Sequence, residues 1–214
     1  MPDLLKKSLF MLMLSVFALA ISSIAMCYEL TDRNAPLMQA GFMPKAPQID
    51  GVINQDEWSS SGSSNTFHLL GSDNILIPTP EMYIGFDKEN LYIAVNIPLS
   101  AGYQIKAVKR DRDGQIWEDD TVEVFVDPKH DQHSDYQFSI NAVGSIAESL
   151  NKDATWNGNW QAKSSQENGY WQTEIKIPFN TLDLGPLDSR KVIGLNIALD
   201  KTFPATKYYV WSKM

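Results

Sequence analysis

Short runs that alternate apolar and polar residues, separated by turn residues, limit most strongly what this chain can fold into. Apolar side chains recur at every second position in the segments 82–86, 91–97, 122–126 and 171–177. A period of two places these side chains on one face of a strand, and no long 3.6-residue helical pattern occurs after residue 25. We therefore predict an all-β fold in which antiparallel strands form a two-layered β-sandwich.

The alternation also predicts which side chains face the core. Residues 87–90 form the turn of a hairpin between the first two segments. The valines at 122, 124 and 126 share the inner face of one strand, which leaves Glu123 on its outer face. Further strands are predicted for the segments 136–140, 145–150, 161–165, 193–199 and 208–210, and a short helical turn for 179–184.

The N-terminus has the three parts of a secretory signal peptide. Lys6 and Lys7 supply positive charge, the stretch Ser8–Ala20 is almost wholly apolar, and small residues lead up to Ala25. The alternative, a membrane anchor, needs about 20 apolar residues, which is more than the unbroken stretch provides. We therefore predict a signal helix over residues 1–25, cleaved after Ala25, and a secreted or periplasmic mature chain without a membrane span.

Cys27 leaves a second form of export open. A bacterial lipoprotein also places a cysteine just after the apolar region, but Met26 stands where a small residue is expected. Because Cys27 is the only cysteine, no intrachain disulfide can form, so the core or metal ions must hold the exported domain. The polar, proline-containing residues 26–45 are predicted to be a leader or linker, and residues 46–214 the sandwich domain.

The net charge excludes some partners. The chain carries a formal charge of −8, and removal of the signal with Lys6 and Lys7 makes the mature chain more acidic. An acidic surface repels phosphate backbones and anionic lipid, so we predict no nucleic-acid partner, whereas a neutral polysaccharide is compatible. The sequence also has no Gly-rich phosphate loop, no Cys/His cluster with zinc spacing and no Ser-His-Asp pattern.

Six tryptophans offer candidate platforms for sugars, whose apolar C–H faces stack on aromatic rings. Trp58 and Trp171 lie in core patterns, and we predict that both are buried. Trp117 precedes three consecutive acidic residues, and we predict that it is exposed, because a buried ring seldom lies among so many charges. Trp156 and Trp160 bracket a turn, where they are either ligand platforms or ordinary packing at a strand edge.

The segment 110–128 has the most specific pattern in the chain, RDRDGQIWEDDTVEVFVDP. It resembles the central signature of the family 9 carbohydrate-binding modules. Four other pieces resemble the same family in the same order, namely residues 47–58, 86–95, 136–141 and 169–179. The resemblance implies a DOMON-like β-sandwich of jelly-roll type that binds glucose- or xylose-based saccharides without catalysis, as an appendage of glycoside hydrolases.

The resemblance also implies which residues bind the ligand. In this family a sugar lies between two tryptophans, polar side chains bind its hydroxyls, and calcium ions hold loops. Trp117 matches the first tryptophan, Glu123 matches a polar contact, and Asn141 falls in the family's Phe-x-x-Asn pattern. With Trp156 and Trp160 as further aromatic candidates, these residues form the predicted ligand site.

Two departures from the family pattern bear on this site. Ser139 stands where the family has an arginine, which removes a bidentate clamp for hydroxyls. Trp211-Ser212 matches the Trp-Ser that precedes the second platform, yet the sequence stops at Met214. We therefore expect the last strand and the second platform to be missing, unless one of the two candidate tryptophans or a tyrosine substitutes. Either the sequence is truncated or strong binding has been lost.

Asp111 and Asp113, with Gly114, resemble part of a calcium loop, since calcium prefers several carboxylates around a sharp turn. The complete EF-hand pattern is absent, so a solvated acidic turn explains these residues equally well. The family resemblance favours calcium slightly, and we predict Asp111 and Asp113 as ligands.

A glycoside hydrolase is one alternative function. It would need two carboxylates across a cleft, and the candidates are Glu118, Asp120 and Glu123. Nothing in the sequence marks one of them as the acid, so catalysis is the weaker hypothesis.

A haem-binding, DOMON-like electron-transfer domain is the second alternative. Such domains use histidine and methionine ligands, and this chain offers His68, His130, His133 and Met82. His130 and His133 lie in a polar stretch typical of a solvated turn, and the sequence has no Cys-x-x-Cys-His attachment motif.

Overall fold

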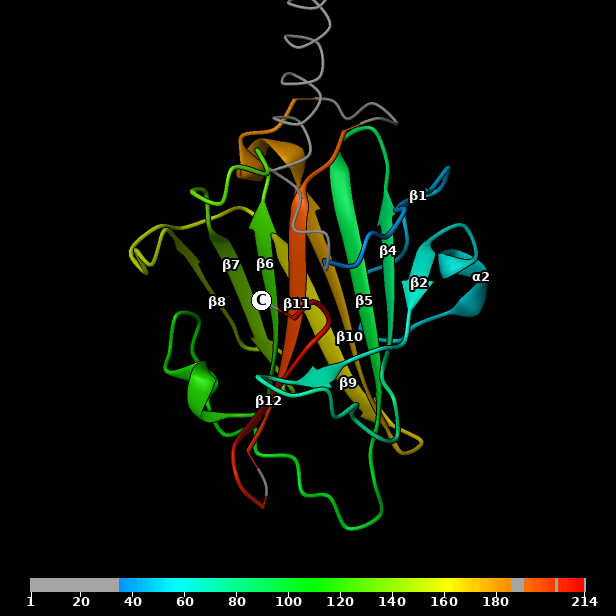
Figure 1. Ribbon diagram of the computed structural model, residues 1–214, viewed down its shortest axis with the longest axis vertical. Coiled ribbons are helices and arrows are strands. Elements are labelled where there is room, and N and C mark those ends of the chain that lie inside the picture. Colours follow the sequence, from blue (N-terminus) through cyan, green and yellow to red (C-terminus); the bar gives the residue numbers. More distant parts are fainter. Residues whose placement is uncertain (1–34, 186–190, 203, 214) are drawn as a thin grey trace, which may run out of the picture. The chain divides into compact units, whose positions relative to one another are not determined.

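The computed structural model describes residues 35–185, 191–202 and 204–213. Residues from Leu37 onward form a unit of two sheets, each with six strands (Figure 1). Sheet A contains β1 (Gly41–Phe42), β2 (Gly62–Ser64), β4 (Glu81–Phe86), β5 (Asn90–Pro98), β9 (Gln161–Glu167) and β10 (Tyr170–Pro178). Sheet B contains β3 (His68–Leu69), β6 (Thr121–Asp127), β7 (Tyr136–Asn141), β8 (Ile146–Leu150), β11 (Gly194–Lys201) and β12 (Lys207–Val210).

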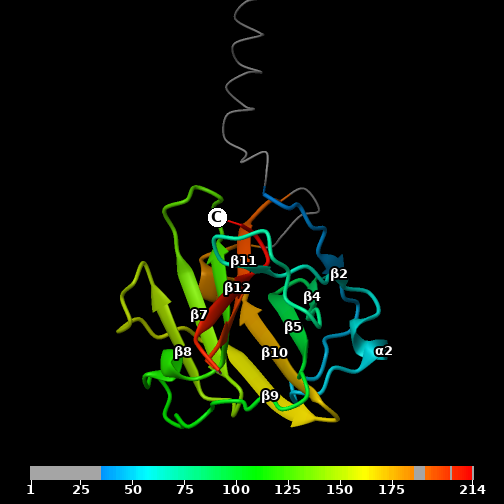
Figure 2. The ribbon, with the colours of Figure 1, turned by 60° about the horizontal axis from the view of Figure 1, so that its bottom comes forward.

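The strand order gives each sheet a nearly uniform antiparallel character. Sheet A runs β1-β4-β5-β10-β9, with β2 also paired to β4, and only β1 and β4 are parallel. Sheet B runs β3-β12-β11-β6-β7-β8 with antiparallel neighbours throughout. The helical segments among the described residues are short: α2 (Gln55–Trp58), η1 (Ile116–Glu118) and η2 (Phe179–Leu182). The prediction of an all-β antiparallel sandwich is confirmed (Figures 1 and 2).

The predicted signal over residues 1–25, Cys27 and most of the predicted leader lie outside the described residues. Within the part of the chain that the structure describes, no helix is long and apolar enough to cross a membrane.

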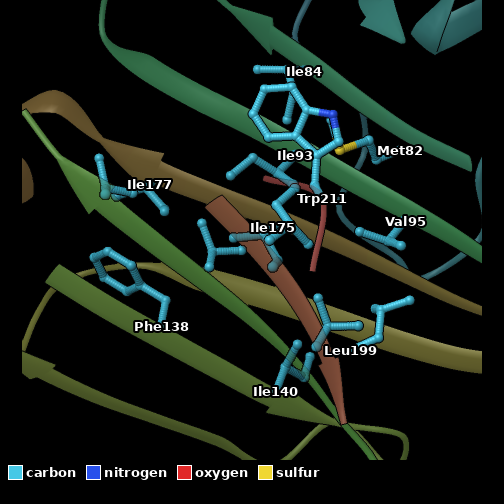
Figure 3. Packing of buried hydrophobic residues seen from close by; sticks show 14 of the residues in the cluster. Met82, Ile84, Ile93, Val95, Phe138, Ile140, Ile175, Ile177, Leu199 and Trp211 are labelled. Carbon is cyan, nitrogen blue, oxygen red and sulfur yellow. The ribbon is translucent and has the colours of Figure 1, made fainter. Parts of the chain in front are cut away.

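The main core fills the space between the two sheets, as the alternation predicted. Figure 3 shows Ile84, Ile93 and Ile175 of sheet A approaching Phe138 and Leu199 of sheet B. All five are buried, and each such side chain contributes about 1.5–3 kcal/mol to folding through removal from water. The valines at 122, 124 and 126 are buried in the same cluster, which confirms that β6 turns its other face outward.

A second, smaller core lies on the outer face of sheet A. Met43, Ile53 and Trp58 pack there against Tyr83 and Tyr92, and Figures 1 and 2 show α2 beside β2 at this side of the sheet. Trp58 and Trp171 are both buried, as predicted. The segment before β4 therefore packs on the outer face of sheet A and covers the part of that face around Tyr83 and Tyr92.

Glu174 of β10 holds the segment that contains Asp50, Gly51 and Trp58 against sheet A through hydrogen bonds. Its Oε1 accepts a hydrogen bond from Trp58 Nε1 at 2.9 Å, and its Oε2 accepts from the backbone N–H groups of Asp50 and Gly51 at 3.0 and 2.9 Å. Gly51 has φ +89°, and a Cβ there would meet the backbone of Ser164 at 3.0 Å. The Ile49-Asp50-Gly51 and Glu57-Trp58 pieces thus have a structural role.

The predicted leader joins the sandwich before its expected boundary at Ala46. Gly41 and Phe42 pair with Gly85 and Phe86 of β4, and the Met43 N–H donates to the Phe86 carbonyl at 2.8 Å. Met43 is buried in the second core. The sequence gives no sign of this pairing, because two paired residues show no readable alternation, while the edge of β4 supplies the backbone groups for them.

We expect Glu174→Ala to lower the free energy of unfolding by about 3 kcal/mol, because it leaves two buried N–H donors and one part-buried N–H donor without an acceptor. Urea unfolding monitored by tryptophan fluorescence measures this loss. Glu167→Ala, at an exposed position of the neighbouring β9, is the control and should change stability by less than about 0.5 kcal/mol. Equal effects of the two substitutions would contradict the fastening role of Glu174.

Candidate functional site on the outer face of sheet B

The outer face of sheet B presents a row of polar side chains. Residues directly opposite one another on paired strands point to the same side of a sheet. Strand register therefore places Tyr208, Asp200, Thr121 and Asn141 in one row, from β12 across β11 and β6 to β7. The next row contains His68, Val210, Ala198, Glu123, Ser139 and Ala147.

Trp117 stands at the end of this face. It lies in η1, just before β6, and 60% of its surface is exposed, as the sequence predicted. The turn is held by Asp119, whose Oδ2 accepts hydrogen bonds from the N–H groups of Val108 and Lys109 at 3.0 and 2.8 Å and from Asn141 Nδ2 at 3.0 Å. An exposed ring on a fixed turn is a suitable platform for a flat ligand.

Asn141 cannot fill the ligand role predicted for it. The residue is fully buried, and its Nδ2 donates to the Lys109 carbonyl and to Asp119. Its Oδ1 accepts from the N–H groups of Val143 and Ser145. All of its hydrogen-bonding groups are thus used within the protein, and Asn141 positions the turn that bears Trp117.

Glu123 faces outward, as the alternation predicted, and is half-buried. Ser139 lies opposite it on β7 and donates from Oγ to Glu123 Oε1 at 3.3 Å. Burial raises the pKa of the Glu123 carboxyl, and hydrogen bonds from Ser139 and Gln137 oppose that rise. Glu123 is therefore a hydrogen-bond acceptor with little competing water around it.

Asp200 is a second carboxylate on this face. It lies diagonally across from Glu123 and is only 6% exposed. Burial, together with the nearby carboxylates of Glu123 and Asp120, raises the pKa of Asp200 to about 7. None of the described residues donates a hydrogen bond to the Asp200 carboxylate.

Two neighbours of Asp200 complete the candidate site. Thr121 is fully buried, and its Oγ1 has no hydrogen-bond partner among the described residues. Tyr208, on the other side of Asp200, is 47% exposed and presents an aromatic ring to this face. The sequence pattern does not mark Asp200, Thr121 and Tyr208 as site residues, although the inward positions of Ile197 and Leu199 imply that Asp200 points outward.

Neither of the other candidate tryptophans offers a free face comparable to that of Trp117. Trp160 is 5% exposed, its Nε1 donates to Glu148 at 3.0 Å, and its ring packs edge-on to Phe138 at 5.1 Å. Trp156 is half-buried, edge-on to Tyr136 at 5.4 Å. The platform role predicted for Trp160 does not fit its burial, and Trp156 has the strand-edge packing that was its alternative.

The turn that carries Asp111 and Asp113 is exposed. Its backbone is tied down by the Asp113 N–H, which donates to the Ile146 carbonyl at 3.0 Å, and Arg112 Nε lies 3.7 Å from Asp113 Oδ2. The described residues hold no cluster of three or more His, Cys, Asp or Glu side chains suited to a metal ion. Two exposed carboxylates supply fewer oxygens than calcium prefers, so calcium binding here stays a prediction.

Asp120 and Glu118, two of the carboxylates that a glycoside hydrolase could use, have partners within the protein. Asp120 accepts four hydrogen bonds, from Tyr103 Oη, the Lys106 N–H, and the N–H and hydroxyl of Thr202. Glu118 forms an ion pair with Lys109 at 2.9 Å. Asp120 therefore fastens the loop before β6, at the end of the sandwich.

The candidate haem ligands are scattered. Met82 is fully buried in the main core, whereas His130 and His133 lie in an exposed turn whose backbone is held by Asp127 and Asp131. Nothing in these placements favours the haem alternative.

The sequence profile of the family described as "Carbohydrate family 9 binding domain-like" matches residues 49–207. The chain belongs to this family. The match contains Trp117 and the polar face with Glu123 and Asp200, and it confirms the resemblance that the sequence predicted. Membership supports a carbohydrate-binding function for this module, in place of the haem-binding alternative.

Several solved structures share the fold. A presumed carbohydrate-binding protein from Bacteroides uniformis has 19% identity and a TM-score of 0.55, over 70% of this chain and 78% of its own. A family 9 module from Caldicellulosiruptor kristjanssonii in complex with glucose has 14% identity and a TM-score of 0.55, over 79% of this chain and 83% of its own. Its complex with cellotriose gives 14% identity and a TM-score of 0.56, over 78% and 79%. No curated protein matches the chain.

Asp200 predicts an unusual dependence of stability on pH. Its carboxyl has a higher pKa in the folded state, about 7, than the ordinary value of 3.8. The folded state thus holds the proton more tightly, and raising the pH from about 4 to about 7 lowers the free energy of unfolding, by something on the order of 3 kcal/mol. We expect Asp200→Asn to be more stable than the natural protein at pH 8 and no more stable at pH 4.

Thermal unfolding followed between pH 4 and pH 8 measures this difference. Glu167→Gln removes one negative charge from an exposed position of sheet A and is the charge-matched control, with an unchanged pH profile. A destabilised Asp200→Asn protein at pH 8 would show that the carboxylate has a partner in the folded state.

Proposed function

We propose that this protein binds a glucan- or xylan-type saccharide, without catalysis, on the outer face of sheet B. The observation that supports this most strongly is the exposed ring of Trp117 on a turn fixed by Asp119 and Asn141, at the end of a face with two carboxylates. Stacking on the ring would bind the apolar face of a pyranose, while carboxylate oxygens would accept hydrogen bonds from its hydroxyls.

Tyr208 is the candidate for the second aromatic face. It shares a row with Asp200 and Thr121, two strands away from the strand that follows Trp117. Neighbouring strands are about 4.8 Å apart, so Tyr208 and Thr121 are separated by about 10 Å across the sheet. That width accommodates one sugar ring between the aromatic side chains, with Asp200 and Glu123 beneath it.

The similar family 9 module from Caldicellulosiruptor kristjanssonii, which was solved with glucose and with cellotriose, supports a glucose-based ligand. Binding without catalysis is supported by family membership and by the structural commitments of Asp120 and Glu118. The predicted signal over residues 1–25 supports a secreted or periplasmic location. There the module would bring polysaccharide to a separate glycoside hydrolase.

We expect Trp117→Ala to raise the dissociation constant for cellotriose at least about tenfold, because the platform for stacking is lost. Isothermal titration calorimetry with glucose, cellobiose, cellotriose and xylobiose measures the affinity. The matched control is Tyr170→Ala, which removes an exposed aromatic ring from β10 in sheet A. Unchanged binding in Trp117→Ala, or no binding of any of these sugars to the folded natural protein, would contradict the proposal.

A further inference from the structure

The candidate face has negative charge without a positive partner. Glu123 and Asp200 are diagonal neighbours on β6 and β11, a relation that puts their Cβ atoms within about 7–8 Å. Strand register assigns no Lys or Arg to the outer face of sheet B among the described residues. Ser139, opposite Glu123, is neutral.

The lysine next to Asp200 in the chain points elsewhere. Lys201 follows Asp200 on β11, so its side chain leaves the strand on the opposite side. Its ammonium lies over the ring of Tyr103, 4.1 Å from the ring centroid. The other titratable side chains on the outer face are Tyr208, next to Asp200, His68, which lies opposite Val210 on β3, and Asp127 at the far end of β6. Asp127 accepts hydrogen bonds from the backbone N–H groups of Lys129 and Gln132.

Buried polar groups on this face also lack partners. Thr121 Oγ1 is fully buried between Asp200 and Asn141 and has no hydrogen bond within the described part of the chain. Asp200 is more than nine-tenths buried, and no described residue donates a hydrogen bond to its carboxylate. Burying a carboxylate without a partner is unfavourable, and the raised pKa of Asp200 reflects that burial and the neighbouring carboxylates. A ligand that brings a cation and hydrogen-bond donors would pair with the Asp200 carboxylate and with Thr121 Oγ1.

We propose that the face selects a saccharide bearing a protonated amine, with the ammonium between Glu123 and Asp200 and within reach of Thr121 Oγ1. This inference rests on the proposed function, because the sugar ring is held by Trp117. An ammonium has three N–H donors, enough for both carboxylates and the threonine hydroxyl. A neutral sugar offers only uncharged donors to the same oxygens, and charge-assisted hydrogen bonds are the stronger kind.

Three disaccharides with the same β-1,4 linkage test this at pH 7 by titration calorimetry. Cellobiose has hydroxyls at the second carbon, the glucosamine disaccharide has ammonium groups there, and its N-acetylated form has neutral amides. We expect the glucosamine disaccharide to bind at least about tenfold more tightly than cellobiose, and the N-acetylated form to lose that gain. Asp200→Asn and Glu123→Gln should each bring the affinity ratio towards one.

Glu167→Gln, which removes the same charge from an exposed position of sheet A, is the control and should keep the ratio. A ratio near one in the natural protein, or one that persists in both Asp200→Asn and Glu123→Gln, would overturn the inference while leaving saccharide binding intact. Titration with calcium chloride alone is a further arm: binding of calcium that disappears in Asp200→Asn would assign the carboxylates to a metal instead. Absence of binding by all three disaccharides and by xylobiose would overturn the proposed function itself.

Discussion

The strict alternation along β6 ties the core of this protein to its candidate ligand face. The valines at 122, 124 and 126 are buried between the sheets, so Thr121 and Glu123 must point outward. A shift of one residue in register would bury Glu123 in an apolar core, at a cost of several kcal/mol. The position of Glu123 on the outer face therefore follows from the packing of the sandwich, and does not depend on a loop.

Buried carboxylates in this protein divide into two groups. Glu174 accepts three hydrogen bonds and fastens the segment over sheet A, while Asp120 accepts four and fastens the loop before β6. Asp119 joins Asn141 to the turn of Trp117 through its Oδ2, while its buried Oδ1 has no hydrogen-bond partner among the described residues. Asp200 has no such donors, so its burial is not offset by hydrogen bonds and raises the pKa of its carboxyl. Unsatisfied groups of this kind concentrate where a ligand supplies what the protein lacks.

The sequence was sufficient for the sandwich, because a period of two is readable in long strands such as β5 and β10. It was also sufficient for Trp117, since a ring followed by three acidic residues is seldom buried. It was insufficient for β1, β2 and β3, whose two or three residues show no period and form through pairing with distant strands.

The candidate site itself could be predicted only in part. Asn141 and Trp160 have residue types suited to sugars, but tertiary contacts with Lys109, Asp119 and Glu148 use up their polar groups. Asp200 joins the face because β11 pairs with β6, and Tyr208 joins it because β12 pairs with β11; no local pattern reveals either pairing. Residue type indicates what a side chain can do, while its partners decide whether it is free to do it.

An NMR titration of the isotopically labelled protein with cellotriose tests the location of the ligand most directly. Binding on the outer face of sheet B should shift the indole N–H signal of Trp117 and the backbone amides of Glu123, Ser139 and Ala198. The indole signals of the buried Trp58 and Trp171 should stay in place. Shifts confined to the outer face of sheet A, or none at saturating ligand, would contradict a saccharide site at Trp117.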